Sequence, residues 1–79
     1  MRGDLLQLIA EVLGVDLSEI GEDSDNTSVR GWDSATEVEL ALMLEHEFSI
    51  SLDEGEMSAL ISVRNIRSTL AKHGVALGG

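Results

Sequence analysis

The spacing of apolar residues constrains the fold of this chain more than any other feature. Leu5, Leu6, Ile9, Val12 and Leu13 recur at three- and four-residue intervals, which places them on one face of a helix. Later segments repeat this spacing, and no segment shows the apolar–polar alternation of a strand. The sequence also contains no proline, the residue that disrupts helices most. We therefore predict an all-α fold.

Helix start and stop signals divide the chain into four expected helices within a single domain, residues 1–79. The expected ranges are about 4–13, 34–48, 53–60 and 62–73, followed by a loose tail at 75–79. Three longer helices and one short helix predict a small four-helix bundle. The first loop is long for so small a domain, and such loops are usually functional or disordered. Within it, Val15, Leu17 and Ile20 are expected to form one apolar turn against the core.

The chain is strongly acidic. Fifteen acidic residues against five basic ones give a formal net charge of −10. A nucleic-acid-binding protein needs the opposite sign, and an anionic membrane surface would repel this chain. The charge instead favours protein partners that carry basic patches and are found by electrostatic steering.

Length and cysteine content narrow the function classes further. A chain of 79 residues has little room for the deep cleft that most enzymes need. The absence of cysteine excludes disulfides, zinc–thiolate sites and thiol nucleophiles. There is no apolar run of about 20 residues to span a membrane, and the first residues are unlike a signal peptide. We therefore expect a monomeric, cytoplasmic protein that is not an enzyme.

The long loop contains a partial calcium-binding pattern, with side-chain oxygens on Asp23, Asp25 and Thr27. The sixth position of the pattern is Ser28, where a glycine is needed, and the twelfth is Ser34, where a bidentate glutamate is needed. We therefore do not predict a metal site in this loop.

The two histidines give no sign of a metal or catalytic site. His46 and His73 lie on different expected helices, outside any triad or ligand spacing. We interpret each as a lone surface residue.

The helix expected at residues 34–48 has two different faces. Its start fits a capping box, Ser34-x-x-Glu37, and Asp33 is an equally good cap. One arc is apolar and predicted to be buried; it comprises Val38, Leu40, Ala41, Leu44 and Phe48. The other arc mixes acids with small and apolar side chains; it comprises Ala35, Glu39, Leu42 and His46, with Glu45 at its edge. Spacing alone favours a solvated flank for this second arc over a docking surface.

Residues 31–40, with the sequence Gly-Trp-Asp-Ser-Ala-Thr-Glu-Val-Glu-Leu, resemble the prosthetic-group site of the acyl carrier protein family. That family has an Asp-Ser pair at the start of its second helix, frequently followed by Val-Glu-Leu. The order of the elements also fits along nearly the whole chain. The matching residues are Asp33-Ser34, Val38-Glu39-Leu40, Glu45-x-Glu47-Phe48, and Ser62-Val63 with Ile66 and Leu70.

The resemblance implies that Ser34 carries 4′-phosphopantetheine, flanked by Asp33 and transferred from coenzyme A by a Mg²⁺-dependent phosphopantetheinyl transferase. The arm would hold cargo as a thioester, so the carrier domain would be a substrate of its partner enzymes. Other implied partners are an acyl- or aminoacyl-loading enzyme, and synthases or transferases with basic docking patches. The implied partner-binding residues are Ala35, Glu39, Leu42, Glu45, His46 and Glu47.

One departure and two alternatives accompany this resemblance. Ala35 stands where the family commonly has leucine, which would remove about 1–2 kcal/mol of contact and select among partners. The Gly-Trp-Asp-Ser sequence is more similar to carriers of polyketide, nonribosomal-peptide or related specialised pathways than to the alternative, a carrier of primary fatty acid synthesis. The second alternative is an acidic helical interaction module without a prosthetic group, in which Ser34 only caps a helix. Trp32 is expected to pack against the edge of the bundle.

Overall fold

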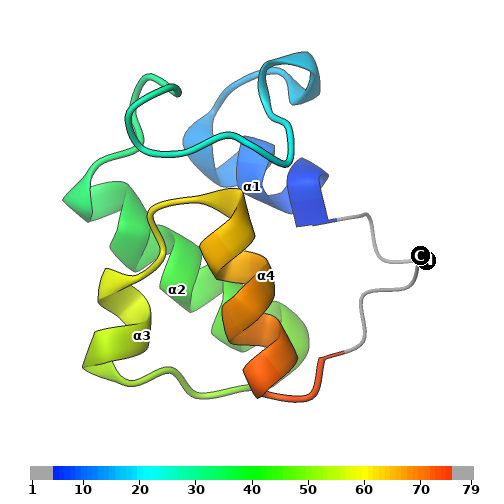
Figure 1. The fold of residues 1–79 in the computed structure, drawn as a ribbon, viewed down its shortest axis with the longest axis vertical. Helices are drawn as coiled ribbons and strands as arrows, with labels where there is room; N and C mark the ends of the chain where they lie inside the picture. The colour runs from blue at the N-terminus through cyan, green and yellow to red at the C-terminus, as the bar shows by residue number, and fades with distance from the viewer. Residues whose placement is uncertain (1–4, 76–79) are drawn as a thin grey trace.

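The computed structural model describes residues 5–75, which fold into helices joined by loops (Figure 1). The elements are α1 (Leu5–Leu13), the 3₁₀ turn η1 (Leu17–Glu19), α2 (Ser34–Phe48), α3 (Glu54–Ser58) and α4 (Val63–Lys72). Within the described residues there is no strand, only an isolated antiparallel bridge between Asp25 and Ser62. The prediction of an all-α bundle with three longer helices and one short helix is confirmed.

The core lies where α1, α2 and α4 meet. Each of these helices contributes residues at three- and four-residue spacing, as expected for one buried stripe on each helix. The loops close the core from outside with Ile20, Val29, Trp32, Leu52 and Leu60. The buried helical residues are Leu5, Ile9 and Ala10 from α1, Leu40, Ala41 and Leu44 from α2, and Val63, Ile66 and Leu70 from α4.

Two apolar residues that we expected in the core are exposed. Val38 is 54% exposed, because two residues of helix turn it about 200° away from the buried Leu40. Leu17 is 45% exposed, because the short 3₁₀ turn directs only its flanks, Val15 and Ile20, toward the core.

The helix bounds differ from the expected ranges at their capping residues. Asp53 and Ser62 have extended backbone conformations and cap α3 and α4 from outside, so these helices begin at residues 54 and 63. The third helix also ends earlier than expected, at Ser58, because the buried Leu60 belongs to the link between α3 and α4. Asp4, the expected start of the first helix, lies outside the described residues.

The expected loose tail starts one residue too early. Val75 donates its backbone N–H to the carbonyl of Leu70 at 3.0 Å and packs against the core. This fold-back follows Gly74, whose φ of +77° is the left-handed conformation typical of a helix stop. Residues 76–79 lie outside the described part of the chain.

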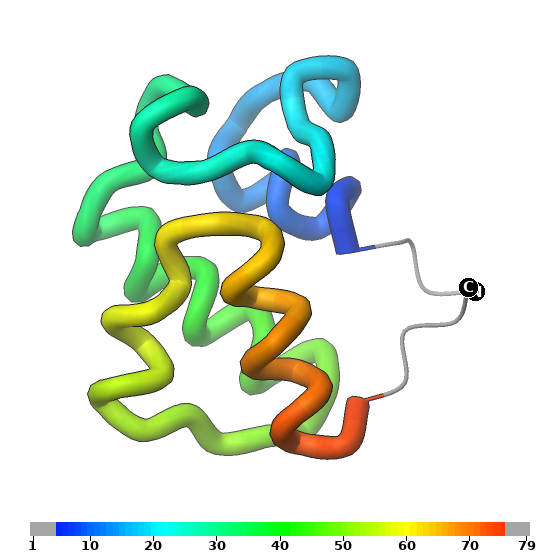
Figure 2. Tube along the Cα trace, viewed as in Figure 1, coloured from blue at the N-terminus to red at the C-terminus, as the bar shows by residue number. Residues whose placement is uncertain are grey.

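The long loop between α1 and α2 crosses one end of the bundle (Figure 2). Its backbone is tied to the start of α4 by two hydrogen bonds, from Asn26 N–H to the Ile61 carbonyl at 2.8 Å and from Val63 N–H to the Ser24 carbonyl at 3.0 Å. The loop is therefore an ordered strap that leads directly to the start of α2.

Candidate functional site

The chain enters α2 through a tight turn anchored in the core. Val29 and Trp32 are buried, and Trp32 is only 4% exposed, which places it deeper than the bundle edge that we expected. Its indole N–H donates to the backbone carbonyl of Leu60 at 3.0 Å. Between them, Gly31 has a φ of +88°, a conformation that favours glycine, and its carbonyl accepts the N–H of Asp33 at 3.1 Å. The turn thus fixes the backbone just before the helix.

Asp33 caps α2. Its carboxylate accepts the backbone N–H of Thr36 at 3.0 Å, and its own backbone is extended. This hydrogen bond lowers the pKa of Asp33 below the ordinary aspartate value, because it stabilises the ionised form. Of the two caps that the sequence allowed, the structure contains the Asp33 cap, and Ser34 becomes the first residue of the helix.

The capping role of Asp33 leaves the hydroxyl of Ser34 available. Ser34 is exposed, and within residues 5–75 its hydroxyl has no hydrogen-bond partner. Thr36, the next hydroxyl along the helix, instead donates to the Gly31 carbonyl at 2.6 Å. Ser34 therefore presents an unengaged nucleophilic oxygen at the start of a 15-residue helix.

This position also suits an anion attached to Ser34. The N-terminal turn of a helix carries a partial positive charge and N–H groups that point outward, so a phosphodiester there is stabilised. The exposed hydroxyl and the helix terminus together fit a phosphopantetheine attachment.

The arc predicted from Ala35, Glu39, Leu42 and His46 is exposed along its whole length. Leu42, at 60% exposed, is its largest apolar residue. Val38, which we expected to be buried, lies on the same side, four residues before Leu42. We call these five residues the α2 face. The spacing of Ser34, Val38 and Leu42 by four was the sequence signal that could have placed Val38 there.

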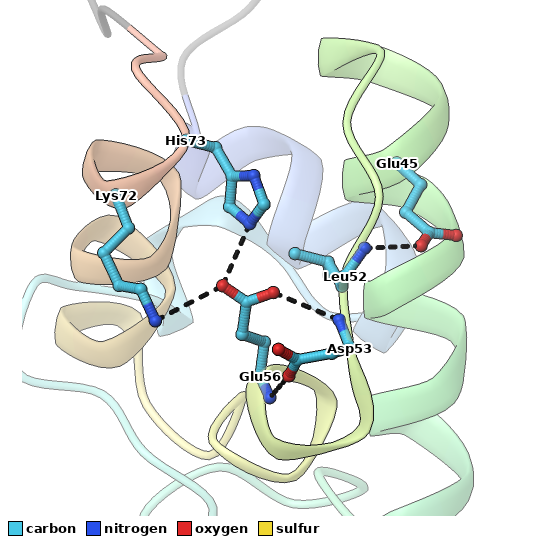
Figure 3. Close-up of polar contacts among 6 residues, drawn as sticks. All are labelled: Glu45, Leu52, Asp53, Glu56, Lys72 and His73. Atoms are coloured by element: carbon cyan, nitrogen blue, oxygen red, sulfur yellow. Dashed lines mark hydrogen bonds and ion pairs between the residues drawn. The ribbon is translucent and has the colours of Figure 1, made fainter.

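The two remaining partner-binding candidates, Glu45 and Glu47, are less exposed than the α2 face. Glu45 is half-buried, and its carboxylate accepts the backbone N–H of Leu52 at 2.8 Å, which holds the loop after α2 (Figure 3). Glu47 is also half-buried, and it is turned about 120° around the helix from Ala35. The structure thus gathers Ala35, Glu39, Leu42 and His46 on one exposed side of α2, keeps Glu45 at the edge of that side as expected, and turns Glu47 away from it.

A second polar cluster, away from Ser34, holds α3 in place (Figure 3). The carboxylate of Glu56 accepts the backbone N–H of Asp53 at 3.1 Å, and it contacts His73 Nε2 at 2.9 Å and Lys72 Nζ at 3.4 Å. Asp53 in turn accepts the Glu56 N–H at 2.7 Å. His73 is therefore not the lone surface residue that we predicted. No residue of α3 is fully buried, so these polar contacts hold α3 together with the packing of the half-buried Met57 against the core.

The Glu56 carboxylate has a lowered pKa. The hydrogen bond from the Asp53 backbone is the main cause, and the contacts with His73 and Lys72 act in the same direction against partial burial. Glu56 is ionised at neutral pH, and its negative charge lies beside the ammonium group of Lys72, the last residue of α4.

The loop carboxylates that suggested calcium binding have other partners. Asp25 accepts the backbone N–H and the hydroxyl of Thr27 at 2.9 and 2.7 Å, and Asp23 pairs with Arg64 at 2.9 Å. The bonds to Thr27 lower the pKa of Asp25. Among residues 5–75, no three carboxylate or imidazole groups are gathered in a way that could hold a metal ion. In the same range, no helix is long and apolar enough to cross a membrane.

Comparison with known proteins supports the interpretation of this site. Residues 3–70 match the family described as phosphopantetheine attachment site. An acyl carrier protein of Clostridium acetobutylicum is 35% identical over 66 residues, 84% of this chain and 86% of that protein. The polyketide-8 synthase acyl carrier protein 2 of Streptomyces avermitilis is 32% identical over 63 residues, 80% of this chain and 72% of that protein. An acyl carrier protein of Syntrophobacter fumaroxidans is 30% identical over 76 residues, 96% of this chain and 94% of that protein.

The family match covers most of the chain and includes the loop, the Asp33 cap and the exposed Ser34. The alignments also cover most of each relative's own length. With its helical bundle and its match to the phosphopantetheine attachment family, this chain belongs to the acyl carrier protein family and carries 4′-phosphopantetheine covalently.

Proposed function

We propose that Ser34 is the attachment point and that the chain presents acyl or aminoacyl thioesters to biosynthetic enzymes. The observation that carries this proposal is that Asp33, and not Ser34, caps α2. Asp33 satisfies the helix cap, so the exposed hydroxyl of Ser34 is left without a partner in the described residues. A serine that served only as a cap would have its oxygen engaged.

In the proposed reaction, Ser34 Oγ attacks the phosphoanhydride of coenzyme A and displaces adenosine 3′,5′-bisphosphate, while its proton passes to the transferase. One oxygen–phosphorus bond forms as another breaks. The start of α2 then stabilises the phosphodiester through its N-terminal N–H groups. When bound, the arm supplies the thiol that holds the cargo, which the chain, having no cysteine, does not supply itself.

The α2 face supports a role in docking partner enzymes. It places the apolar side chains of Val38 and Leu42 beside Glu39, directly below Ser34 along the same helix. A partner with a small apolar patch ringed by basic residues would match this surface and would be steered to it by the net charge of −10. Glu45 and Glu47 would contribute only at the edge, because both are half-buried.

For the pathway, we propose specialised metabolism, with polyketide or nonribosomal-peptide synthesis first. The Gly-Trp-Asp-Ser sequence and the likeness to a polyketide synthase carrier support this choice. Primary fatty acid synthesis is the alternative, because other relatives are named simply acyl carrier protein. Expression of this chain in a bacterial strain depleted of its own fatty acid carrier distinguishes the two pathways. We expect no growth even when the expressed protein is fully modified. Restored growth would contradict the specialised role.

The attachment itself is tested by intact mass. Purified protein, shown to be folded and unmodified, is incubated with coenzyme A, Mg²⁺ and a broad-specificity phosphopantetheinyl transferase. We expect a gain of one phosphopantetheine in the wild type and none in Ser34→Ala. An unmodified wild type across several transferases would contradict the proposal and favour an interaction module without an arm.

A further inference from the structure

Trp32 is the buried residue closest in sequence to Ser34, and it bonds to a segment far away in the sequence. Its indole N–H donates to the carbonyl of Leu60, 28 residues away, at 3.0 Å. Leu60 is fully buried in the link between α3 and α4, which runs beside the start of α2 (Figure 1). This hydrogen bond therefore joins the entrance of α2 to another part of the core.

The Leu60 carbonyl, which accepts the Trp32 N–H, lies in a segment that is itself held by hydrogen bonds. Leu60 donates its own N–H to the Met57 carbonyl at 3.2 Å, and the next carbonyl, that of Ile61, accepts the N–H of Asn26 from the long loop at 2.8 Å. The Leu60 carbonyl is thus held between α3 and the loop strap. A group bonded to it has a defined position relative to the whole bundle.

The backbone between Trp32 and Ser34 has little freedom. Only Asp33 separates the two residues, and its N–H bonds back to the Gly31 carbonyl at 3.1 Å while its carboxylate caps the helix. Thr36 donates to that same Gly31 carbonyl at 2.6 Å. A rotation or shift of Trp32 would therefore carry Ser34 with it.

We propose that Trp32 is a positioning residue for the modification of Ser34: its hydrogen bond to the Leu60 carbonyl fixes the turn that orients the Ser34 hydroxyl toward the transferase. The inference rests on the proposed function of Ser34. Trp32 does not touch the reacting atoms, and it acts through the Gly31–Asp33 turn. A displacement of about 1 Å at a reacting atom is enough to slow a reaction by up to about a hundredfold.

This role predicts a particular kinetic pattern in Trp32→Phe, which keeps a buried aromatic ring and loses the N–H donor. The transferase reaction should show a kcat about tenfold lower, because the hydroxyl is less well oriented. Its KM should be unchanged, because the α2 face is unaltered. With excess transferase and time, the variant should reach the same final mass as the wild type.

A matched control separates positioning from general destabilisation. Ile9→Val removes one methylene from the fully buried part of α1 and leaves the turn and the link intact. Both variants are assayed well below their melting temperatures, and folding is checked by circular dichroism. We expect Ile9→Val to have the kcat of the wild type.

The proposal is overturned if Trp32→Phe retains the wild-type kcat, or if Ile9→Val loses as much. If Trp32→Phe does not fold, a benzothienylalanine at position 32, which replaces only the ring N–H with sulfur, gives the decisive comparison. This replacement is clean because the chain contains one tryptophan. Absence of modification in the wild type would instead contradict the proposed function of Ser34. Failure of the proposed function and failure of the positioning role of Trp32 are therefore distinguishable.

Discussion

Asp33 and Ser34 are neighbours at the start of α2 but have different environments. The carboxylate of Asp33 is committed to the Thr36 N–H, whereas the hydroxyl of Ser34 has no partner within residues 5–75. Ser62 provides a contrast at the start of α4, where its hydroxyl accepts the Asn65 N–H at 3.0 Å. Of these two serines at helix starts, Ser62 thus caps its helix through its hydroxyl, whereas Ser34 does not.

This contrast predicts unequal effects on stability when each of the two hydroxyls is removed. Ser34→Ala should change the free energy of unfolding by less than about 0.5 kcal/mol, since it breaks no hydrogen bond in the described structure. Ser62→Ala should lower that free energy by about 1 kcal/mol through the loss of its cap. Urea denaturation followed by circular dichroism measures both. A loss in Ser34→Ala as large as that in Ser62→Ala would show that Ser34 caps α2.

Glu56 makes stability sensitive to acid. Its pKa in the folded chain lies below the ordinary glutamate value of 4.5. The stability that it contributes is therefore fully present above pH 4.5 and is lost as the pH falls through the lowered pKa. Below that range the Glu56 carboxyl is neutral and its attraction to His73 and Lys72 is gone.

We predict that Glu56→Gln flattens this acid dependence. The melting temperature of the variant should lie below that of the wild type at neutral pH, and the two should converge as the pH falls below 4.5. Glu54→Gln is the control, since Glu54 is exposed on the same helix and its carboxylate has no partner within residues 5–75. A constant gap between Glu56→Gln and the wild type at every pH would contradict this account.

At the scale of elements, local signals were sufficient to predict α2. Its start is set by Asp33, and its buried stripe by the spacing of Leu40 and Leu44, all readable within a few residues. The burial of Val38 was predicted wrongly because Val38 lies at the margin of the apolar arc, about 60° beyond the buried Ala41, where no other segment covers it. The end of α3 was also misplaced, since nothing local shows that Leu60 turns into the core.

The end of α2 carries a small, removable strain. Ser49 has a left-handed conformation with a φ of 54°, which is unfavourable for a residue with a side chain. Ser49→Gly should therefore raise the free energy of unfolding by about 1 kcal/mol. Ser51→Gly is the control, because Ser51 is exposed and has no positive φ. Equal effects of the two substitutions in urea denaturation would argue against strain at Ser49.

The α2 face predicts a docking role for Leu42. Leu42→Ser should raise the KM of a partner enzyme for this carrier by about tenfold, because the substitution removes apolar area that docking buries. Its stability should hardly change, since Leu42 is 60% exposed. Leu17→Ser removes a similarly exposed leucine, 45% exposed and outside α2, and should leave KM unchanged. The same KM change in both variants would show that partners do not distinguish this face.

At the scale of the whole molecule, contacts distant in sequence define the candidate site. The Trp32–Leu60 bond, the bridge between Asp25 and Ser62, and the Glu56–His73 contact each join separate segments. Apolar periodicity predicts which face of a helix is buried, but it does not identify the partner segment. The sequence therefore indicated Ser34 and the exposed arc, whereas the anchoring of the site became visible only in the structure.

The location of the prosthetic group tests the central claim most directly. After reaction with the transferase, cleavage at arginine yields a peptide of residues 31–64 that contains Ser34 together with Ser49, Ser51 and other hydroxyls. Fragmentation of this peptide by mass spectrometry should place one phosphopantetheine on Ser34. Modification at any other hydroxyl, or in Ser34→Ala, would contradict the assignment of Ser34 as the site where this carrier holds its arm.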